Sequence, residues 1–325
     1  EAMADLVQII RSGLKLAMPA SSIEVAGRRN HLDNGDFTVW QRGTTHTSVG
    51  TFQNSNDAYI ADRWYLLSDG NDIVDVDKTQ DSPGGLGYCL RLDVETVNKK
   101  FGVAQIVESI HCEGLAGQTV TLSFWAKVSA TAKLDNIKAA VVSWTGTADV
   151  VTSGLVSAWG AEGTNPTLIA NATYENTPAN LGVTTSWAQY SITCAVDTSG
   201  AKNIVVMIWS DVTDTTLGHF LYVTDVQLSR SATALPFERL PITTQEVRCM
   251  RYFEVLQGSS VYIYGTIGNL SYVYWYYKVR KRQTPTFTNI SGNFTVDNSS
   301  VDFVGGYRAS NYAYIGAGSY ASIDL

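Results

Sequence analysis

The sequence predicts an all-β protein: a jelly-roll β-sandwich followed by a small C-terminal β domain, with a short N-terminal helix. Three observations predict this class. Aromatic residues make up 11% of the chain and charged residues only 16%. Glycine occurs 27 times alongside many Thr, Ser and Asn residues, a mixture that favours strands and tight turns. From Asn34 onward, short apolar runs of period two alternate with Gly, Asn, Asp and Ser.

Residues 1–30 are expected to form an attachment or oligomerisation helix and a linker. Met3, Val7, Ile10 and Leu14 alternate spacings of four and three, as the a and d positions of a heptad repeat do. Two heptads are marginal as an isolated coiled coil. A helix that trimerises or docks on a partner and a helix that packs on its own domain therefore remain alternatives.

Residues 31–230 are expected to form the jelly roll. Nine strand candidates at regular spacing indicate a sandwich of two antiparallel sheets. No fixed-period repeat is present, which argues against a β-helix or a propeller. The candidates are Phe37 to Gln41, Arg63 to Leu67, Tyr88 to Val94, Val103 to Ile110, Thr119 to Val128, Lys138 to Trp144, Ala188 to Ala195, Asn203 to Trp209 and Phe220 to Leu228.

Residues 231–250 read as a connector and residues 251–325 as the C-terminal β domain. The first part of the connector contains two prolines and has no clear period, so the jelly roll is expected to end before it. A helical turn is predicted over Thr244 to Tyr252. The C-terminal region then alternates apolar and polar residues, as four to six short strands would.

One strand of this C-terminal region is aromatic on both faces. Tyr274, Trp275 and Tyr276 lie in the run SYVYWYYKV, which an exposed monomeric sheet tolerates poorly. Tyr and Trp are enriched at protein interfaces, so this strand is predicted to form part of an oligomer interface. A receptor-binding tip is the alternative use of the same residues.

Charge and cysteine content restrict the function classes. The net charge is −7 and the longest basic run is Lys278 to Arg282, so no nucleic-acid partner is expected. No apolar run is long enough to cross a bilayer, and membrane insertion is not expected. The four cysteines are Cys89, Cys112, Cys194 and Cys249, which form no CxxC pair. Buried reduced thiols are expected, with a bridge between Cys89 and Cys112 as the alternative.

Several motifs resemble those of known families. The segment NGDFTVWQRG at residues 34–43, followed by ADRW at 61–64, resembles the opening of many tail-fibre and other virion proteins of tailed bacteriophages. PFERLP at residues 236–241 and RYFE at 251–254 are similar to a junction of the same family. TLSFWAK at residues 121–127 resembles a motif of carbohydrate-binding modules of the jelly-roll type.

The resemblance implies a virion protein on the exterior of the tail or capsid, made in the host cytoplasm. It implies a jelly roll with a sugar-binding face. Host surface polysaccharide and other virion proteins are the expected partners, the latter through the N-terminal helix. Together with the aromatic surplus, it also suggests a homotrimer.

Three tryptophans are the candidate ligand-binding residues. Trp144, Trp159 and Trp187 lie at predicted strand ends or in the loops rich in Gly and Thr between residues 144 and 190. There an exposed indole could stack on a pyranose ring while neighbouring Asn or Asp side chains bind its hydroxyl groups. Structural roles for these tryptophans are the competing interpretation.

Two other groups have mainly structural interpretations. Trp40, Trp64 and Trp125 lie on predicted strands within the shared motifs, where large aromatic side chains usually fill a sandwich core. Asp36 and Asp225 could meet at one sheet edge. With backbone carbonyls they could start a structural calcium site, as the resemblance to carbohydrate-binding modules implies, and turn capping by the same side chains is the alternative.

The function expected from these features is adhesion to host surface glycans by a tail fibre or receptor-binding protein. The sequence contains no HExxH, GxSxG or Walker A motif, so the protein is not expected to be an enzyme. One alternative is an architectural head-fibre, decoration or tail-connector protein with no ligand site. A second is a glycan hydrolase, which would need two carboxylates flanking the scissile bond.

Overall fold

The computed structural model describes most of the chain between residues 29 and 323. The described residues are 29–47, 58–152, 154–197, 200–256, 261–264, 271–288, 295–308, 312–315 and 319–323. The predicted N-terminal helix, with Met3, Val7, Ile10 and Leu14, lies outside these residues.

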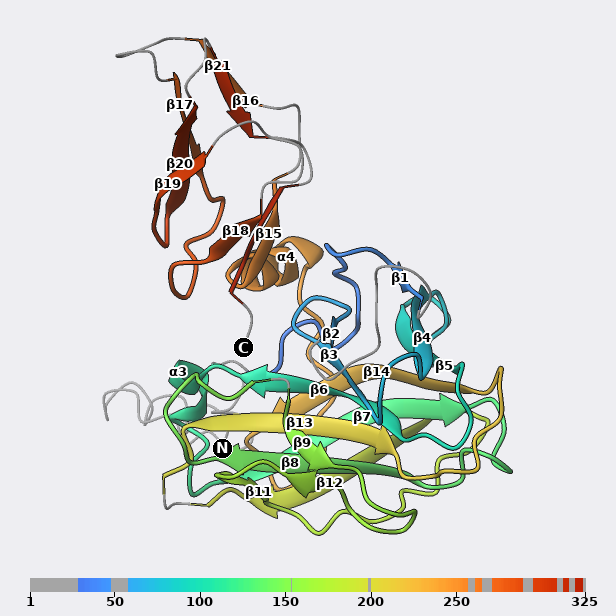
Figure 1. Cartoon of the computed structure of the whole chain (residues 1–325). Helices are drawn as coiled ribbons and strands as arrows, with labels where there is room; N and C mark the ends of the chain where they lie inside the picture. Colours follow the sequence, from blue (N-terminus) through green and yellow to red (C-terminus); the bar gives the residue numbers. More distant parts are fainter. Residues whose placement is uncertain are drawn as a thin grey trace, which may run out of the picture.

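Two six-stranded antiparallel sheets form the β-sandwich in the lower part of Figure 1, so the predicted fold class is confirmed. The first, called the β7 sheet, has the order β1 (Thr45–His46), β4 (Val74–Thr79), β5 (Cys89–Val94), β14 (Phe220–Ser229), β7 (Thr119–Val128) and β12 (Ala188–Ala195). The second, the β8 sheet, has the order β11 (Ala172–Tyr174), β8 (Ile137–Trp144), β13 (Asn203–Ser210), β6 (Phe101–Val107), β3 (Tyr65–Ser68) and β2 (Ala58–Tyr59).

The two sheets differ in how their outer faces are covered. In β7, Leu122, Phe124 and Ala126 point into the core, and the residues between them point outward. Strands β8 and β13 are instead buried along their whole length. Their second face packs under the chain between residues 145 and 174, which carries the short strands β9 (Val156–Ala158) and β10 (Thr167–Leu168). The described part of the chain therefore leaves the outer face of the β7 sheet the more open one.

Most of the predicted strands are present. Thr119–Val128 and Ala188–Ala195 match their predicted bounds. The predicted strand Phe37 to Gln41 is wrong, because this segment is a loop. Asn34 holds the loop by accepting a hydrogen bond from the N–H of Val39 (2.9 Å) and donating one to its carbonyl (2.8 Å). A local side-chain bond of this kind competes with strand pairing.

The glycine of the NGDF motif is needed for close packing of the backbone. A Cβ at Gly35 would lie 2.0 Å from the carbonyl oxygen of Val226, so no side chain fits there. The N–H of Val226 donates to the carbonyl of Gly35 (2.8 Å). Strand β14 has a β-bulge at this point, between Thr224 and Gln227.

The C-terminal strands form three small sheets that project from the sandwich beyond α4 (Figure 1). Helix α4 (Ile242–Met250) confirms the predicted helical turn, and α3 (Ser109–Cys112) is a short turn after β6. The sheets are β15 (Phe253–Val255), β22 (Tyr320–Ser322) and β18 (Thr286–Thr288); β16 (Val261–Tyr264) and β21 (Tyr312–Ile315); and β17 (Ser271–Tyr276), β20 (Phe303–Arg308) and β19 (Thr295–Ser299).

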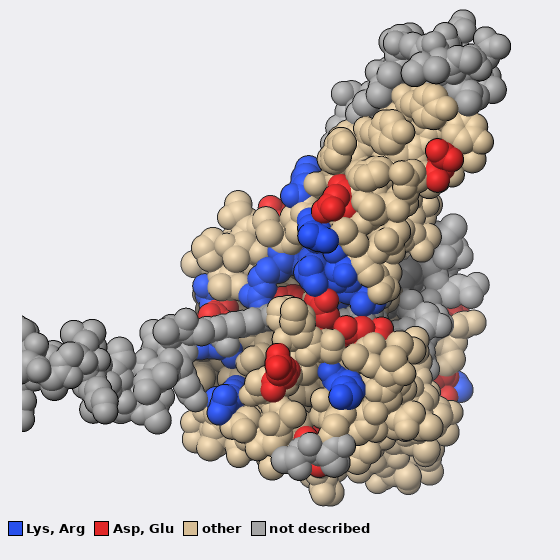
Figure 2. All heavy atoms as spheres, turned by 90° about the vertical axis from the view of Figure 1, so that its left-hand side faces the viewer, with Lys and Arg blue, Asp and Glu red and all other residues tan. Residues whose placement is uncertain are grey.

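Ion pairs from helix α4 and the residue that follows it join the C-terminal region to the sandwich. Arg248 pairs with the buried Asp33 (2.8 Å), and Arg251 pairs with Glu108 (2.8 Å). The side chain of Tyr252 donates to Glu108 (2.8 Å) and lies under the guanidinium of Arg63, 3.6 Å from its ring centroid. Figure 2 shows basic and acidic side chains gathered where the two parts meet. The RYFE and ADRW motifs thus lie at one junction, although the sequence separates them by almost two hundred residues.

The four cysteines are buried thiols, as expected, and the alternative of a bridge between Cys89 and Cys112 is wrong. Burial raises the pKa of Cys89 to about 12, which keeps this thiol protonated. Within the described residues, no helix has the length and apolar character needed to span a membrane.

Candidate functional site

A row of long side chains crosses the open outer face of the β7 sheet. Strand register places Tyr222 of β14 opposite Arg91 of β5 on one side and opposite Lys127 of β7 on the other. Side chains in register on neighbouring strands point to the same face, so these three side chains lie next to one another on the surface. All three are half-buried.

Two further aromatic rings extend the row. Trp187, just before β12, meets Tyr222 edge to face, with ring centroids 6.3 Å apart. Phe220 lies on the same strand as Tyr222, at 6.0 Å. The Lys127 ammonium sits 4.7 Å from the Tyr222 ring and 5.1 Å from the Trp187 ring, while the Arg91 guanidinium lies 5.0 Å from Phe220. These five residues are called the outer platform.

Each cation of the outer platform is paired with a carboxylate. Lys127 binds Asp81 (2.6 Å), and Arg91 binds Asp77. The indole N–H of Trp187 also donates to Asp81 (3.0 Å). Burial opposes ionisation of Asp81, but the hydrogen bonds from Lys127 and Trp187 outweigh it and hold the pKa of this carboxyl below its ordinary value. The same hydrogen bonds fix the orientation of the indole.

Acidic residues lie at one end of the platform. Asp93, two residues after Arg91, is opposite Asp75 of β4 in the sheet register. Burial raises the pKa of Asp93; Arg91 opposes this effect, and Asp75 adds to it. Burial, followed by the charges of Asp75 and Asp93, likewise raises the pKa of the exposed Glu95. This end of the surface therefore repels further negative charge.

The structure separates the three candidate tryptophans. Trp187 lies in the outer platform, whereas Trp144 and Trp159 are only 8% and 7% exposed. Both pack in the apolar cluster behind the β8 sheet, and the Trp144 indole donates to the carbonyl of Thr147 (2.9 Å). Their predicted exposure is wrong, because the loop that carries Trp159 folds back onto the sheet instead of standing in solvent.

Sequence reasoning also missed platform residues. Trp64 is fully buried, as predicted, but Trp125 is half-buried and points outward, two residues before Lys127 on β7. Phe220 and Tyr222 were not singled out at all. The signal lies in F-L-Y-V of β14 and W-A-K-V of β7, where large aromatic or cationic side chains occupy every second position and so share one face of the strand.

Asp36 and Asp225 lie near enough to interact, but not at a sheet edge, because β14, which carries Asp225, is an inner strand of the β7 sheet. The charge of Asp36 contributes to a raised pKa for Asp225, about 6, although burial is the largest cause and Arg239 opposes it. Arg239 pairs with Asp225 (2.7 Å), while Gln245 donates to Asp36 (3.1 Å). Protein donors thus already bind both carboxylates. No group of three or more metal-binding side chains is present among the described residues.

The aromatic strand β17 divides its residues between two faces. Tyr274 and Tyr276 are 45% and 73% exposed, whereas Trp275 packs partly buried against the small apolar cluster of these sheets. The predicted need for a partner on both faces is therefore wrong for Trp275. The Tyr274 ring covers Gly305 on β20, where a Cβ would lie 2.5 Å from the ring. Tyr274 and Tyr276 remain candidates for an oligomer interface.

No protein-family model matches this chain, and a search of curated protein sequences finds no relative. Several solved structures are similar in fold. The enzymatically active domain of tailspike protein 4 of bacteriophage CBA120 is 18% identical, with a TM-score of 0.36, over 62% of this chain and 21% of that one. The chain therefore spans about a fifth of that tailspike chain.

Two further solved structures are covered over nearly their whole length. One is a putative sugar binding protein from Bacteroides thetaiotaomicron, 12% identical with a TM-score of 0.37, over 62% of this chain and all of that one. The other is TmCBM61, solved in complex with β-1,4-galactotriose, 14% identical with a TM-score of 0.34, over 62% of this chain and 99% of that one. At these TM-scores the likenesses support no functional conclusion for this chain.

Proposed function

We propose that the outer platform binds a neutral polysaccharide and that the chain acts as an adhesion component of a tailed-bacteriophage virion. The observation that supports this best is the continuous row of Trp187, Lys127, Tyr222, Arg91 and Phe220 on the open face of the β7 sheet. Aromatic rings stack on the apolar faces of pyranose rings, and neighbouring charged groups hydrogen-bond to the hydroxyls.

The charge distribution favours an uncharged glycan. Each platform cation has its carboxylate, Lys127 with Asp81 and Arg91 with Asp77, so the row adds no net charge. The acidic residues Asp93 and Glu95 at one end would repel an anionic chain. A neutral sugar instead offers both donors and acceptors, which the paired charges can bind without being separated.

The virion role rests on the NGDFTVWQRG, ADRW and RYFE motifs, which resemble those of tail-fibre proteins. In this proposal residues 1–30 attach the chain to other virion proteins, on the tail or capsid exterior, and three copies associate. Tyr274 and Tyr276 supply exposed aromatic surface for the contact between copies. Weak single sites would then act together on one host surface, since linking copies raises the effective concentration of the next site.

The test is a glycan array of neutral polysaccharides, followed by titration of the best ligand into the full chain and two variants. Trp187→Ala is expected to weaken binding by about tenfold to a hundredfold, because it removes an aromatic ring that can stack on the sugar and a hydrogen-bond donor to Asp81. Ile110→Ala is the control, since it removes an exposed apolar side chain of α3, outside the outer platform and outside the proposed contact between copies.

Each result has a distinct meaning. Loss of binding in Trp187→Ala with wild-type binding in Ile110→Ala supports the outer platform. Wild-type binding in Trp187→Ala would mean that the glycan binds elsewhere on the chain. If no neutral glycan binds at all, the proposal fails and an architectural role, without a ligand site, becomes the better explanation.

A further inference from the structure

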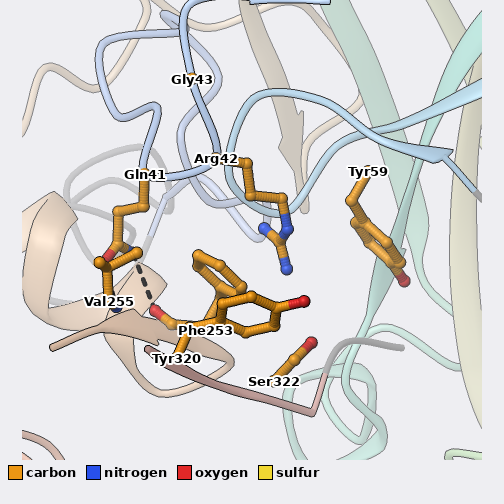
Figure 3. Close-up of a pocket in the computed structure, with 8 residues that line it drawn as sticks. All are labelled: Gln41, Arg42, Gly43, Tyr59, Phe253, Val255, Tyr320 and Ser322. Carbon is orange, nitrogen blue, oxygen red and sulfur yellow. Dashed lines mark hydrogen bonds between the residues drawn. The ribbon is translucent and has the colours of Figure 1, made fainter. Parts of the chain in front are cut away.

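A cavity that is partly open to solvent lies between the sandwich and the C-terminal sheets, away from the outer platform. Its volume is about 650 Å³, in the range of small-molecule sites. Its lining comes from two parts of the chain: Gln41, Arg42, Gly43 and Tyr59 from the sandwich, and Phe253, Val255, Tyr320 and Ser322 from the C-terminal sheets (Figure 3).

Strand pairing determines which side chains face this cavity. In the antiparallel pair β15 and β22, Phe253 is opposite Ser322 and Val255 is opposite Tyr320. These four residues therefore share one face of the small sheet. Glu254, between them on β15, points to the other face, where it is fully buried against Lys281. Among the described residues, the floor of the cavity is therefore aromatic and hydroxylated and carries no carboxylate.

Arg42 enters the cavity from the opposite side. Its guanidinium carbon lies 3.6 Å from the Phe253 ring centroid and 5.1 Å from that of Tyr59, so the side chain is held between two aromatic rings. Figure 3 shows the guanidinium and the hydroxyls of Tyr320 and Ser322 directed toward one another. A guanidinium has five N–H donors, so it can bind a ligand in addition to its contacts within the chain.

Gln41 fixes this arrangement. Its side-chain amide donates to the carboxylate of Asp62 (2.7 Å) and to the carbonyl of Phe253 (2.8 Å), and its carbonyl oxygen accepts from the N–H of Val255 (3.4 Å). The residue next to Arg42 in the chain is therefore bonded directly to the strand that carries Phe253. The two walls of the cavity are held in register before any ligand arrives, which lowers the entropy cost of binding.

We infer that this cavity binds a carboxylated sugar unit, as a second site of the proposed glycan-binding protein. Arg42 is the one charged residue among the eight described residues that line the cavity, and its planar donor group matches a carboxylate in two-point geometry. The rings of Phe253, Tyr59 and Tyr320 provide stacking surface, and the two hydroxyls can bind sugar hydroxyls. The outer platform, with its paired charges and acidic border, favours the opposite ligand class.

The test compares acidic oligosaccharides, each beside its own methyl ester, in titrations against the full chain. The ester keeps the sugar and removes the charge. We expect the acids to bind about tenfold to a hundredfold more tightly than their esters. Arg42→Gln should remove this preference, whereas Arg230→Gln, an exposed arginine that binds Gln118, should keep it. Tyr320→Phe, which removes only a hydroxyl and should leave the fold intact, is expected to weaken acid binding several-fold.

Two results would overturn the inference: equal binding of acid and ester, or acid binding that survives Arg42→Gln. No binding of any of the acidic oligosaccharides at about 10 mM would do the same. The outcome is separable from that of the outer platform, because Trp187→Ala should leave acid binding unchanged. If the chain binds acids but no neutral glycan, the inference for this cavity stands and the proposal for the outer platform fails.

Discussion

The sandwich and the C-terminal sheets are held together in different ways. The sandwich has a continuous apolar core between its two sheets and a second cluster behind the β8 sheet. The described residues of the C-terminal sheets provide a small cluster of Leu256, Val273, Tyr277, Val304 and Ala321. With less apolar area to bury, the smaller part depends more on individual polar contacts.

A fully buried lysine in each part shows this difference in how buried charges are compensated. Lys281 is fully buried with Glu254 (2.5 Å). Lys100 is fully buried with Asp211 (2.6 Å), but Lys138 also pairs with Asp211 (2.7 Å). Loss of Lys100 therefore leaves Asp211 with a second ammonium. Loss of Lys281 leaves the Glu254 carboxylate with the backbone N–H of Lys278 (3.0 Å), a much weaker compensation.

The largest expected effect is that of Lys281→Met. It should destabilise the C-terminal sheets by about 3–5 kcal/mol, because an uncompensated carboxylate remains buried. Hydrogen exchange should show faster exchange in strands β15, β18 and β22, while β7 and β13 stay protected. Lys100→Met is the matched variant, and it should lower the free energy of unfolding by less, because Lys138 still pairs with Asp211. Equal losses for the two variants would mean that the second partner of Asp211 does not matter.

The next effect concerns pH and Asp225, at the bulge of β14. Burial raises its pKa from an ordinary 3.8 to about 6, so the folded state binds this proton more tightly than the unfolded state. The contribution of Asp225 to stability is therefore present below pH 3.8 and is lost as pH rises through about 6. Asp225→Asn should remove this pH dependence.

At pH 7 Asp225→Asn should be more stable than the wild type by roughly 1–3 kcal/mol. Asparagine also suits the backbone there, since Asp225 has a φ of 51°. The partner Arg239 is well exposed, so the loss of its ion pair should cost little. Thermal unfolding between about pH 4 and pH 7 measures both quantities. A variant that keeps the wild-type slope would show that another group is responsible.

A smaller effect is expected at the junction, where the two regions meet. Arg251 and Glu108 form a two-point ion pair that is partly open to solvent. A double-mutant cycle with Arg251→Gln and Glu108→Gln should give a coupling energy of about 1 kcal/mol. Chemical denaturation of the four proteins measures it. A coupling near zero would mean that Arg63 and Tyr252 hold the junction without this pair.

The smallest effect on stability should come from Trp187→Ala. The indole is half-buried on the outer face and contributes little to the apolar core. The free energy of unfolding should therefore fall by less than about 1 kcal/mol. The same denaturation series measures this loss. The contrast with its expected effect on glycan binding distinguishes a surface residue from a core residue. A loss as large as that of Lys281→Met would indicate a structural role for the platform.

The strand pattern of the sandwich was largely readable from the sequence. Thr119–Val128 and Ala188–Ala195 were predicted with their observed bounds, because alternation of apolar and polar residues reports which face is buried. β4 was missed although Val74 and Val76 alternate with Asp75 and Asp77, because aspartate is uncommon in strands and the apolar positions are few. The helical turn after residue 241 was also predicted.

The candidate site was predicted only at Trp187. Trp144 and Trp159 were expected to be exposed because they lie beside Gly- and Thr-rich loops, and composition does not tell whether a loop folds back over a sheet. Trp125 was assigned to the core, but it points outward because it alternates with the buried Phe124 and Ala126 along β7. Pairing across strands far apart in sequence was needed to place Arg91, Tyr222 and Lys127 in one row.

By itself the sequence determined the all-β class, most of the strands and the motifs, because these follow from short-range patterns of polarity and turn residues. Only the tertiary structure decided what the motifs do. NGDFTVWQRG and RYFE meet at the junction, where Gln41 bonds to Phe253 and Arg42 stacks on it. The physical reason is that a pocket is formed by side chains whose distance in space depends on sheet register and domain packing, and neither is encoded in local spacing.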